Sequence, residues 1–123
     1  MIGYTTVGTN DLERAAVFYD ALFAEYGASR FMEMDTFIAW APGPDMPGFS
    51  ITKPFDGNTA SVGNGVMIAL VVDEKEKVDK LHAKALELGA TDEGAPGQRM
   101  PGFYAGYFRD LDGNKINFFC TKD

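Results

Sequence analysis

The chain of 123 residues contains a single cysteine and a single histidine, so it has few of the side chains that most often carry catalysis. One cysteine forms no internal disulfide, which fits a reducing compartment. We interpret Cys120 as a small apolar residue of the last strand rather than a reactive thiol. No apolar run approaches membrane-spanning length and no signal-peptide pattern opens the chain, so we expect a cytoplasmic protein without a membrane partner.

Basic residues are also scarce: 11 lysines and arginines stand against 18 acidic residues, for a net charge of −7. This balance argues against a nucleic-acid partner, whose phosphates would be repelled. It favours a cationic or neutral ligand. The composition, 46% hydrophobic and 24% charged, is typical of an ordinary globular protein. The length suits one domain and is too short for two independent cores.

The chain does contain a repeated unit, and the second copy begins about 63 residues after the first. Asn10-Asp11-Leu12-Glu13 opens an apolar-patterned stretch that ends at Tyr26-Gly27-Ala28. Asp73-Glu74-Lys75-Glu76 opens another that ends at Leu88-Gly89-Ala90. A strand-like run precedes each stretch and short, turn-punctuated strands follow it. We therefore predict two β-α-β-β-β modules, residues 1–55 and 64–123, joined by a linker at 56–63 within a single domain.

Both predicted helices carry the same start and stop signals. An Asx residue followed three positions later by glutamate is the pattern of a reciprocal capping box, here Asn10 with Glu13 and Asp73 with Glu76. The glycine at each helix end suits a left-handed cap. We expect helices over about 11–26 and 74–88.

The strands are predicted from apolar runs between turn signals. The segment 91–98 contains Pro96, so we expect it to bulge or to lie at a sheet edge. Asp112-Gly113 between two apolar runs predicts a hairpin. The expected strands cover residues 2–7, 30–34, 36–41, 49–53, 66–72, 91–98, 103–109 and 115–121.

Several motifs resemble those of the glyoxalase, bleomycin-resistance and extradiol-dioxygenase superfamily, also called the vicinal oxygen chelate fold. They are Asp11-Leu12-Glu13-Arg14-Ala15 followed by Phe18-Tyr19, the Gly63-Asn64-Gly65 approach to a strand, and Phe108-Arg109-Asp110-Leu111-Asp112-Gly113-Asn114-Lys115. The resemblance covers essentially the whole chain. It implies an α+β fold in which two βαβββ modules form a curled mixed sheet, usually in a homodimer, with a ligand site inside the cup.

In metal-dependent members of that superfamily, histidines in the first strand of each module and a glutamate in the last strand hold a divalent cation. Carried onto this sequence, those positions are Tyr4, Met67 and Asn117, with a fourth near Ile51. A protonated phenol, a thioether and a neutral amide are poor ligands for Fe, Mn, Zn or Ni. We therefore predict no metal site and no cofactor. The one histidine, His82, is interpreted as a helix-surface or boundary residue outside the cup.

Two acidic residues near a turn, Glu33 and Asp35, could chelate a cation, but closely spaced acidic side chains of this kind are usually only solvated. They are not counted among the predicted site residues.

If the geometry implied by the resemblance holds, Tyr4, Met67 and Asn117 converge inside the cup. They would form a pocket with an apolar floor, one hydroxyl and one amide. Aromatic side chains are candidate walls because they offer large contact area with few rotatable bonds. Core or dimer packing explains each of them equally well. The candidate walls are Trp40, Phe49, Tyr104 and Tyr107.

Three functions remain open from the sequence. The first is a small-molecule binder without metal, similar to the antibiotic-sequestering members of the superfamily. The second is a metal-independent lyase or isomerase, with Tyr4 as a proton donor and Lys115 or Arg109 as electrostatic partners, although no titratable dyad is visible. The third is a degenerate paralogue whose cup is filled by side chains and which serves as a structural subunit. Whether the chain is an enzyme is left undecided.

Overall fold

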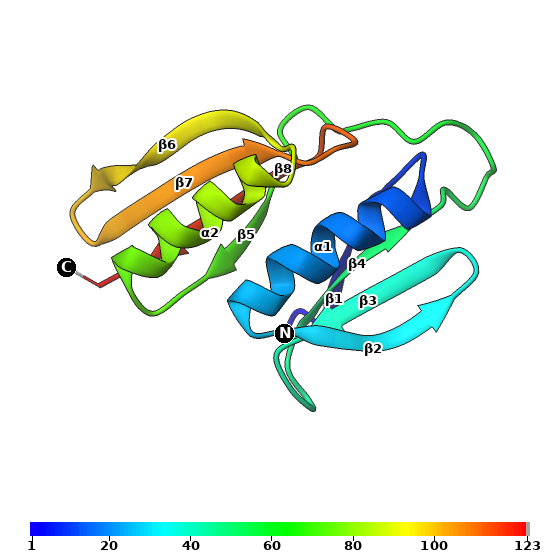
Figure 1. The fold of residues 1–123 in the computed structure, drawn as a ribbon, viewed down its shortest axis with the longest axis horizontal. Helices are drawn as coiled ribbons and strands as arrows, with labels where there is room; N and C mark the ends of the chain where they lie inside the picture. The colour runs from blue at the N-terminus through cyan, green and yellow to red at the C-terminus, as the bar shows by residue number, and fades with distance from the viewer. Residues whose placement is uncertain (123) are drawn as a thin grey trace. The chain divides into compact units, whose positions relative to one another are not determined.

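The computed structural model describes residues 1–122, which fall into two compact units. The first comprises Met1–Val62 and the second begins at Gly63. In each unit a single helix lies across one face of a four-stranded sheet (Figure 1). We call the units module 1 and module 2.

Module 1 has the predicted β-α-β-β-β order. The first strand pairs in parallel with the last, and the remaining neighbours are antiparallel, so the sheet order is β1-β4-β3-β2. The parallel pair places Thr6 directly beside Ser50. The elements are β1 (Tyr4–Gly8), α1 (Leu12–Tyr26), β2 (Ser29–Met34), β3 (Phe37–Ala41) and β4 (Gly48–Thr52).

Module 2 repeats this arrangement with the order β5-β8-β7-β6. Here the parallel pair places Ala69 beside Asn117, the equivalent of Thr6 and Ser50. The elements are β5 (Ile68–Val71), α2 (Lys75–Glu87), β6 (Thr91–Met100), β7 (Phe103–Arg109) and β8 (Lys115–Cys120). The predicted α+β class and the two βαβββ modules are thus confirmed. Met67 lies just before β5, which is shorter than predicted.

Each core forms between the helix and the sheet. In module 1 the ring of Tyr19 on α1 lies 4.8 Å from Phe49 and 5.8 Å from Trp40, between centroids. In module 2 the helix buries Val78 and Leu81 on the side of the sheet that carries Phe108. Full burial of one large apolar side chain contributes about 1.5–3 kcal/mol, so these layers are the main source of stability in each module.

The irregular strand and the hairpin of module 2 follow the prediction. β6 lies at the sheet edge, and its register against β7 shifts at three places. β7 and β8 pair antiparallel around the turn at 110–114, where the Asp110 carboxylate accepts hydrogen bonds from the backbone of Asp112 and Asn114. Gly113 has φ 88°, a conformation that glycine adopts without strain. Cys120 is buried in β8. No helix among residues 1–122 is long and apolar enough to cross a membrane.

The predicted capping boxes are wrong, although the predicted helix ends are confirmed. Asp11, not Asn10, caps α1, and its carboxylate accepts a hydrogen bond from the Arg14 amide. Glu74, not Asp73, precedes α2, and its side chain makes no cap hydrogen bond. The Asp73 carboxylate pairs with Lys77 at 2.7 Å. The glycines after both helices, at positions 27 and 89, are left-handed.

The difference between the two caps predicts unequal effects of matched variants. Asp11→Ala is expected to lower the free energy of unfolding by about 1 kcal/mol, because it removes a cap hydrogen bond. Glu74→Ala removes the same charge near a helix start but no cap bond, so its loss should stay within about 0.5 kcal/mol. Urea unfolding followed by circular dichroism measures both, and equal losses would contradict the cap assignment.

Candidate functional site

Because each sheet has one helix, the other face of each sheet carries no helix of its own module. We call it the helix-free face. Alternation along the strands sends Tyr4, Thr6 and Ser50 to this face in module 1, and Val7 and Ile51 to the face covered by α1. Ile51 itself is buried beneath α1, so the residue near it on β4 that reaches the helix-free face is Ser50.

Apolar side chains crowd the helix-free face of module 1. Tyr4 is 60% exposed and meets Phe37 edge to ring, with 6.1 Å between centroids. Phe31, Met32 and Met34 from β2 are also exposed. At its centre Ser50 is fully buried and satisfied: it donates to the Thr5 carbonyl oxygen at 2.8 Å and lies 2.7 Å from the Thr6 hydroxyl.

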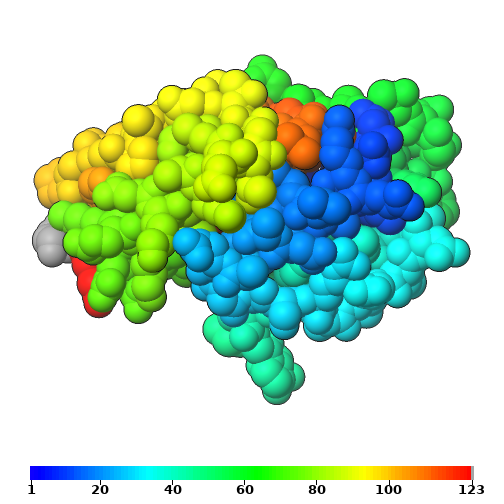
Figure 2. Space-filling model, viewed as in Figure 1, coloured from blue at the N-terminus to red at the C-terminus, as the bar shows by residue number. Residues whose placement is uncertain are grey.

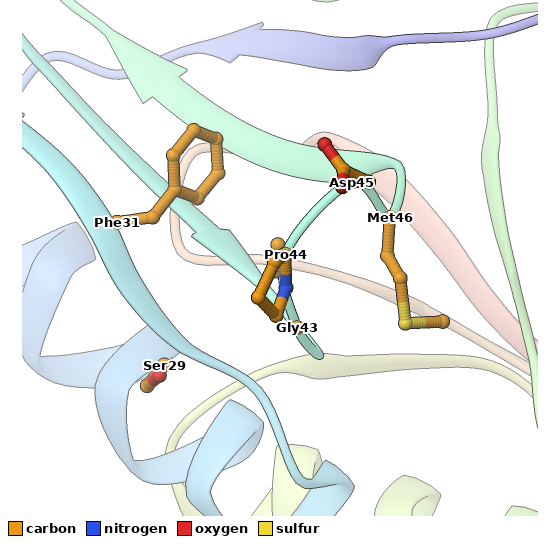
Figure 3. A pocket seen from close by; sticks show the side chains of 7 residues that line it. Ser29, Phe31, Gly43, Pro44, Asp45 and Met46 are labelled. Carbon is orange, nitrogen blue, oxygen red and sulfur yellow. The ribbon is translucent and has the colours of Figure 1, made fainter.

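A hollow of about 320 Å³ lies at one end of this face, between β2 and the loop 42–47 that follows β3 (Figure 3). Phe31 projects from the strand, while Pro44, Asp45 and Met46 come from the loop, which stands out from the body of module 1 (Figure 2). Asp45 has φ 61°, within the left-handed region that aspartate and asparagine tolerate better than most residues. The hollow is lined by Ser29, Phe31, Ala41, Gly43, Pro44, Asp45 and Met46.

Asn117 occupies the position in module 2 that Ser50 occupies in module 1. It is fully buried on the helix-free face, beside Ala69 on β5 and Tyr107 on β7. Unlike Ser50, neither its side-chain oxygen nor its nitrogen has a hydrogen-bond partner among residues 1–122. An unpaired buried polar group of this kind costs about 1–3 kcal/mol.

Two cations flank the ring of Tyr107. The Arg99 guanidinium carbon lies 5.3 Å and the Lys115 Nζ 5.5 Å from the ring centroid. A third cation, Arg109, is paired with Glu93 at 2.7 Å. The helix-free face of module 2 is therefore locally basic, although the chain as a whole is acidic.

The other predicted wall residues lie on helix-covered faces. Trp40 and Phe49 are buried beneath α1, where they pack on Tyr19 and Phe23. Tyr104 faces α2 and donates its hydroxyl to Asp79, and this hydrogen bond raises the pKa of Tyr104. A molecule on a helix-free face would not contact these three rings. The structure places Tyr4, Asn117 and Tyr107 on the helix-free faces, whereas Met67 lies outside the strand pairing, just before β5. The role of all four residues in binding stays a prediction.

His82 is not a surface residue, and that interpretation is wrong. It is 4% exposed, and its Nε2 lies 3.1 Å from both the Asp92 carboxylate and the Tyr107 carbonyl oxygen. Gly106 makes room for the imidazole, because a Cβ at that position would stand 3.0 Å from the ring. The histidine faces the sheet from α2, so it lies on the side opposite the helix-free face.

The donors present do not fit the metal that the fold resemblance implies. Tyr4, Met67 and Asn117 offer a phenol, a thioether and an amide in place of imidazoles and a carboxylate. Across residues 1–122 no group of three or more histidine, cysteine, aspartate or glutamate side chains is placed to hold an ion.

Comparison with known proteins identifies the family. The sequence model of the Glyoxalase/Bleomycin resistance protein/Dioxygenase superfamily matches residues 1–118, so the chain belongs to that superfamily. A glyoxalase/bleomycin resistance protein from Albidiferax ferrireducens T118 is 34% identical over 99% of both chains, with a TM-score of 0.91. A comparison with curated proteins finds no match.

Two further crystal structures share the fold at lower identity. A glyoxalase/bleomycin resistance protein/dioxygenase family enzyme from Burkholderia phytofirmans PsJN is 20% identical over 98% of both chains, with a TM-score of 0.77. A lactoylglutathione lyase from Agrobacterium tumefaciens is 20% identical over 97% of this chain and 92% of its own, with a TM-score of 0.71.

Sequence reasoning missed both the hollow and the cation pair around Tyr107. The Pro-rich segment 42–48 indicated a loop, but nothing in it indicated that Met46 would stand opposite Phe31. The register of β6 shifts at three places, so the side chains of this strand do not alternate regularly between the two faces. The position of Arg99 over Tyr107 was therefore not predictable from the sequence.

Module 1 also contains a charged cluster that supports Trp40. The Asp20 carboxylate accepts hydrogen bonds from Trp40 Nε1 at 2.9 Å and from Arg30 at 2.8 and 2.6 Å. The Arg30 hydrogen bond is the main reason that the pKa of Asp20 lies below its usual value. The carboxylate ties α1 to β2 and β3.

This lowered pKa predicts how stability depends on pH. A carboxyl with a lowered folded pKa stabilises above its unfolded pKa, near 4, and this contribution is lost as the pH falls through the folded pKa. The native chain should have a higher free energy of unfolding than the Asp20→Asn variant at pH 5, and this difference should shrink as the pH falls to 2. Urea unfolding at each pH measures it. Arg30→Gln should weaken the trend without abolishing it, because the remaining Trp40 hydrogen bond also lowers the pKa of Asp20. An advantage that grows on acidification would contradict the prediction.

Proposed function

We propose that the protein binds a small organic molecule without metal chemistry. The observation that carries the proposal is the hollow of about 320 Å³ on module 1, which is of the size that holds a small ligand or part of a larger one. Membership of a superfamily that includes bleomycin resistance proteins supports a binding role. The donor set at Tyr4, Met67 and Asn117 supports a role that does not use the metal chemistry of the fold.

The lining of the hollow indicates the class of ligand. Phe31 and Met46 offer an aromatic ring and a polarisable thioether, which suit an apolar or aromatic body. Asp45 is the only charged residue of the lining, so a positive group on the ligand would be attracted. The net charge of −7 acts in the same direction. The proposed ligand is therefore a neutral or cationic organic molecule.

Fragment titration followed by ¹⁵N NMR tests this proposal. Benzylamine, and more weakly its neutral analogue benzyl alcohol, should shift the amide signals of Gly43, Asp45 and Met46, with millimolar dissociation constants as expected for fragments of this size. Phe31→Ala should weaken both probes, whereas Asp45→Asn should weaken only benzylamine, by about two- to fivefold. Asparagine also tolerates the left-handed backbone at position 45, so this variant should keep the loop intact.

Matched controls separate the hollow from general surface effects. Phe55→Ala removes a fully exposed phenylalanine outside the hollow, and Asp35→Asn removes an exposed carboxylate of the turn after β2. Neither should change binding. If benzylamine shifts no signal of the hollow, or if the controls weaken it as much as the test variants, the binding proposal fails and the degenerate structural paralogue is favoured.

We also infer that two copies of the chain associate. Exposed apolar side chains gather on the helix-free face of module 1, and such a patch is typical of a protein interface. Tyr4, Phe31, Met32 and Met34 are each between 45% and 60% exposed in the single chain. The resemblance to homodimeric proteins of this fold is the second support.

Native mass spectrometry of the untagged protein, purified from its own cells, tests the assembly. We expect a mass twice that of the 13.4 kDa chain, and any co-purifying organic ligand would appear as an added mass. Met32→Lys together with Met34→Lys should shift the distribution towards the single chain, because it places charge in the apolar patch. A native protein that stays monomeric at micromolar concentration would contradict the association.

A further inference from the structure

Three dipeptides of the chain have the pattern that forms a succinimide ring most readily, an aspartate or asparagine followed by glycine. In this reaction the backbone nitrogen of the glycine attacks the side-chain carbonyl carbon of the preceding residue. Glycine favours the attack, because it has no Cβ in the way and leaves the backbone free to rotate. The structure separates the three sites by what holds that nitrogen. They are Asp56-Gly57, Asn64-Gly65 and Asp112-Gly113.

The fold holds the nitrogen at the two aspartate sites. The backbone nitrogen of Gly57 donates to the Pro54 carbonyl oxygen at 3.0 Å, and that of Gly113 donates to the Asp110 carbonyl oxygen at 3.0 Å. The carboxylate of the first site is also occupied, since it accepts hydrogen bonds from the backbone and side chain of Asn58 at 2.9 and 3.1 Å. Each turn must open before its glycine nitrogen can rotate towards the side chain, so folding should slow both reactions.

The asparagine site has no such restraint. Asn64 and Gly65 are exposed, and within residues 1–122 neither the Gly65 backbone nitrogen nor the Asn64 side chain has a hydrogen-bond partner. The turn is closed by one long bond, from the Val66 backbone nitrogen to the Gly63 carbonyl oxygen at 3.2 Å. A Cβ at Gly65 would meet no atom within 4 Å, so there is open space for the ring.

We propose that Asn64 is a site of deamidation in the folded protein. The Gly65 nitrogen forms a bond to Cγ of Asn64, and the bond from Cγ to Nδ2 breaks. The proton of the Gly65 nitrogen passes through solvent to the departing nitrogen, which leaves as ammonia. One water molecule then opens the ring at either of its carbonyl carbons and gives aspartate or isoaspartate at position 64. Water is the only co-reactant.

The products change the start of module 2. Both carry a new carboxylate, which makes the net charge of −7 more negative by one. In isoaspartate the main chain runs through the side-chain carbon, so the turn gains one methylene and the bond between Val66 and Gly63 is displaced. The change lies two residues before β5, an edge strand of its sheet. The inference goes beyond the binding and association proposed above and does not depend on either.

Timed incubation in mildly alkaline buffer, folded and in urea, tests the proposal by peptide mass spectrometry. The peptide that contains Asn64 should gain about 1 Da in the folded protein, at a rate within about threefold of the rate in urea. Isoaspartate at Asp56 and Asp112, detected by enzymatic methylation, should form at least about tenfold more slowly in the folded protein than in urea.

Matched variants locate the reaction. Asn64→Gln keeps the amide but requires a larger ring, so the product should disappear. Asn58→Gln changes an exposed asparagine that threonine follows and should leave the product unchanged. In the deamidated fraction, separated by anion exchange, the ¹⁵N NMR signals of Gly65 and Val66 should shift, whereas that of the buried Val78 should not.

Three results would overturn the proposal. They are the absence of the product at Asn64 in the folded protein, isoaspartate formation at Asp56 and Asp112 that is as fast in the folded protein as in urea, and an equal yield of product from Asn64→Gln.

Discussion

Each module has four strands and only one helix, and the rest of the structure follows from this constraint. The helix that connects the first strand to the next covers one sheet face and buries the large aromatic and aliphatic side chains there. The opposite face has no cover from its own module. Since the first and last strands pair in parallel, their central residues stand side by side on that uncovered face, as Thr6 with Ser50 and Ala69 with Asn117.

The two copies have diverged at these equivalent positions. In module 1 the buried hydroxyl of Ser50 is satisfied within its own strand pair, and the surrounding face is apolar and rich in methionine. In module 2 the buried amide of Asn117 is unsatisfied, and the surrounding face carries Lys115, Arg99 and Tyr107. A duplicated frame thus presents two faces of different chemistry.

Prediction from the sequence was accurate where the signal was local or periodic. The repeat, the two helices, the left-handed glycines at positions 27 and 89 and the hairpin at Gly113 were all predicted. The predicted capping boxes were wrong because each helix begins one residue later than the predicted cap implies, with Asp11 in place of Asn10 and Glu74 in place of Asp73. A shift of one residue removes the spacing that the reciprocal hydrogen bond needs. His82 was misplaced because a polar residue next to a buried stripe is assigned to the surface by pattern alone, whereas Gly106 opens a space for it beneath α2.

The sequence by itself determined the duplication and the α+β class. It also determined that Tyr4, Met67 and Asn117 stand where metal-dependent relatives have histidine or glutamate. All three properties depend only on residue identity and on spacing along the chain. The tertiary structure alone decided which aromatic side chains face a helix: Trp40, Phe49 and Tyr104 do, and Tyr107 does not. It also decided that Asn117 is buried without a partner. A strand pattern specifies two faces, but only the packing of the helix decides which of them is covered.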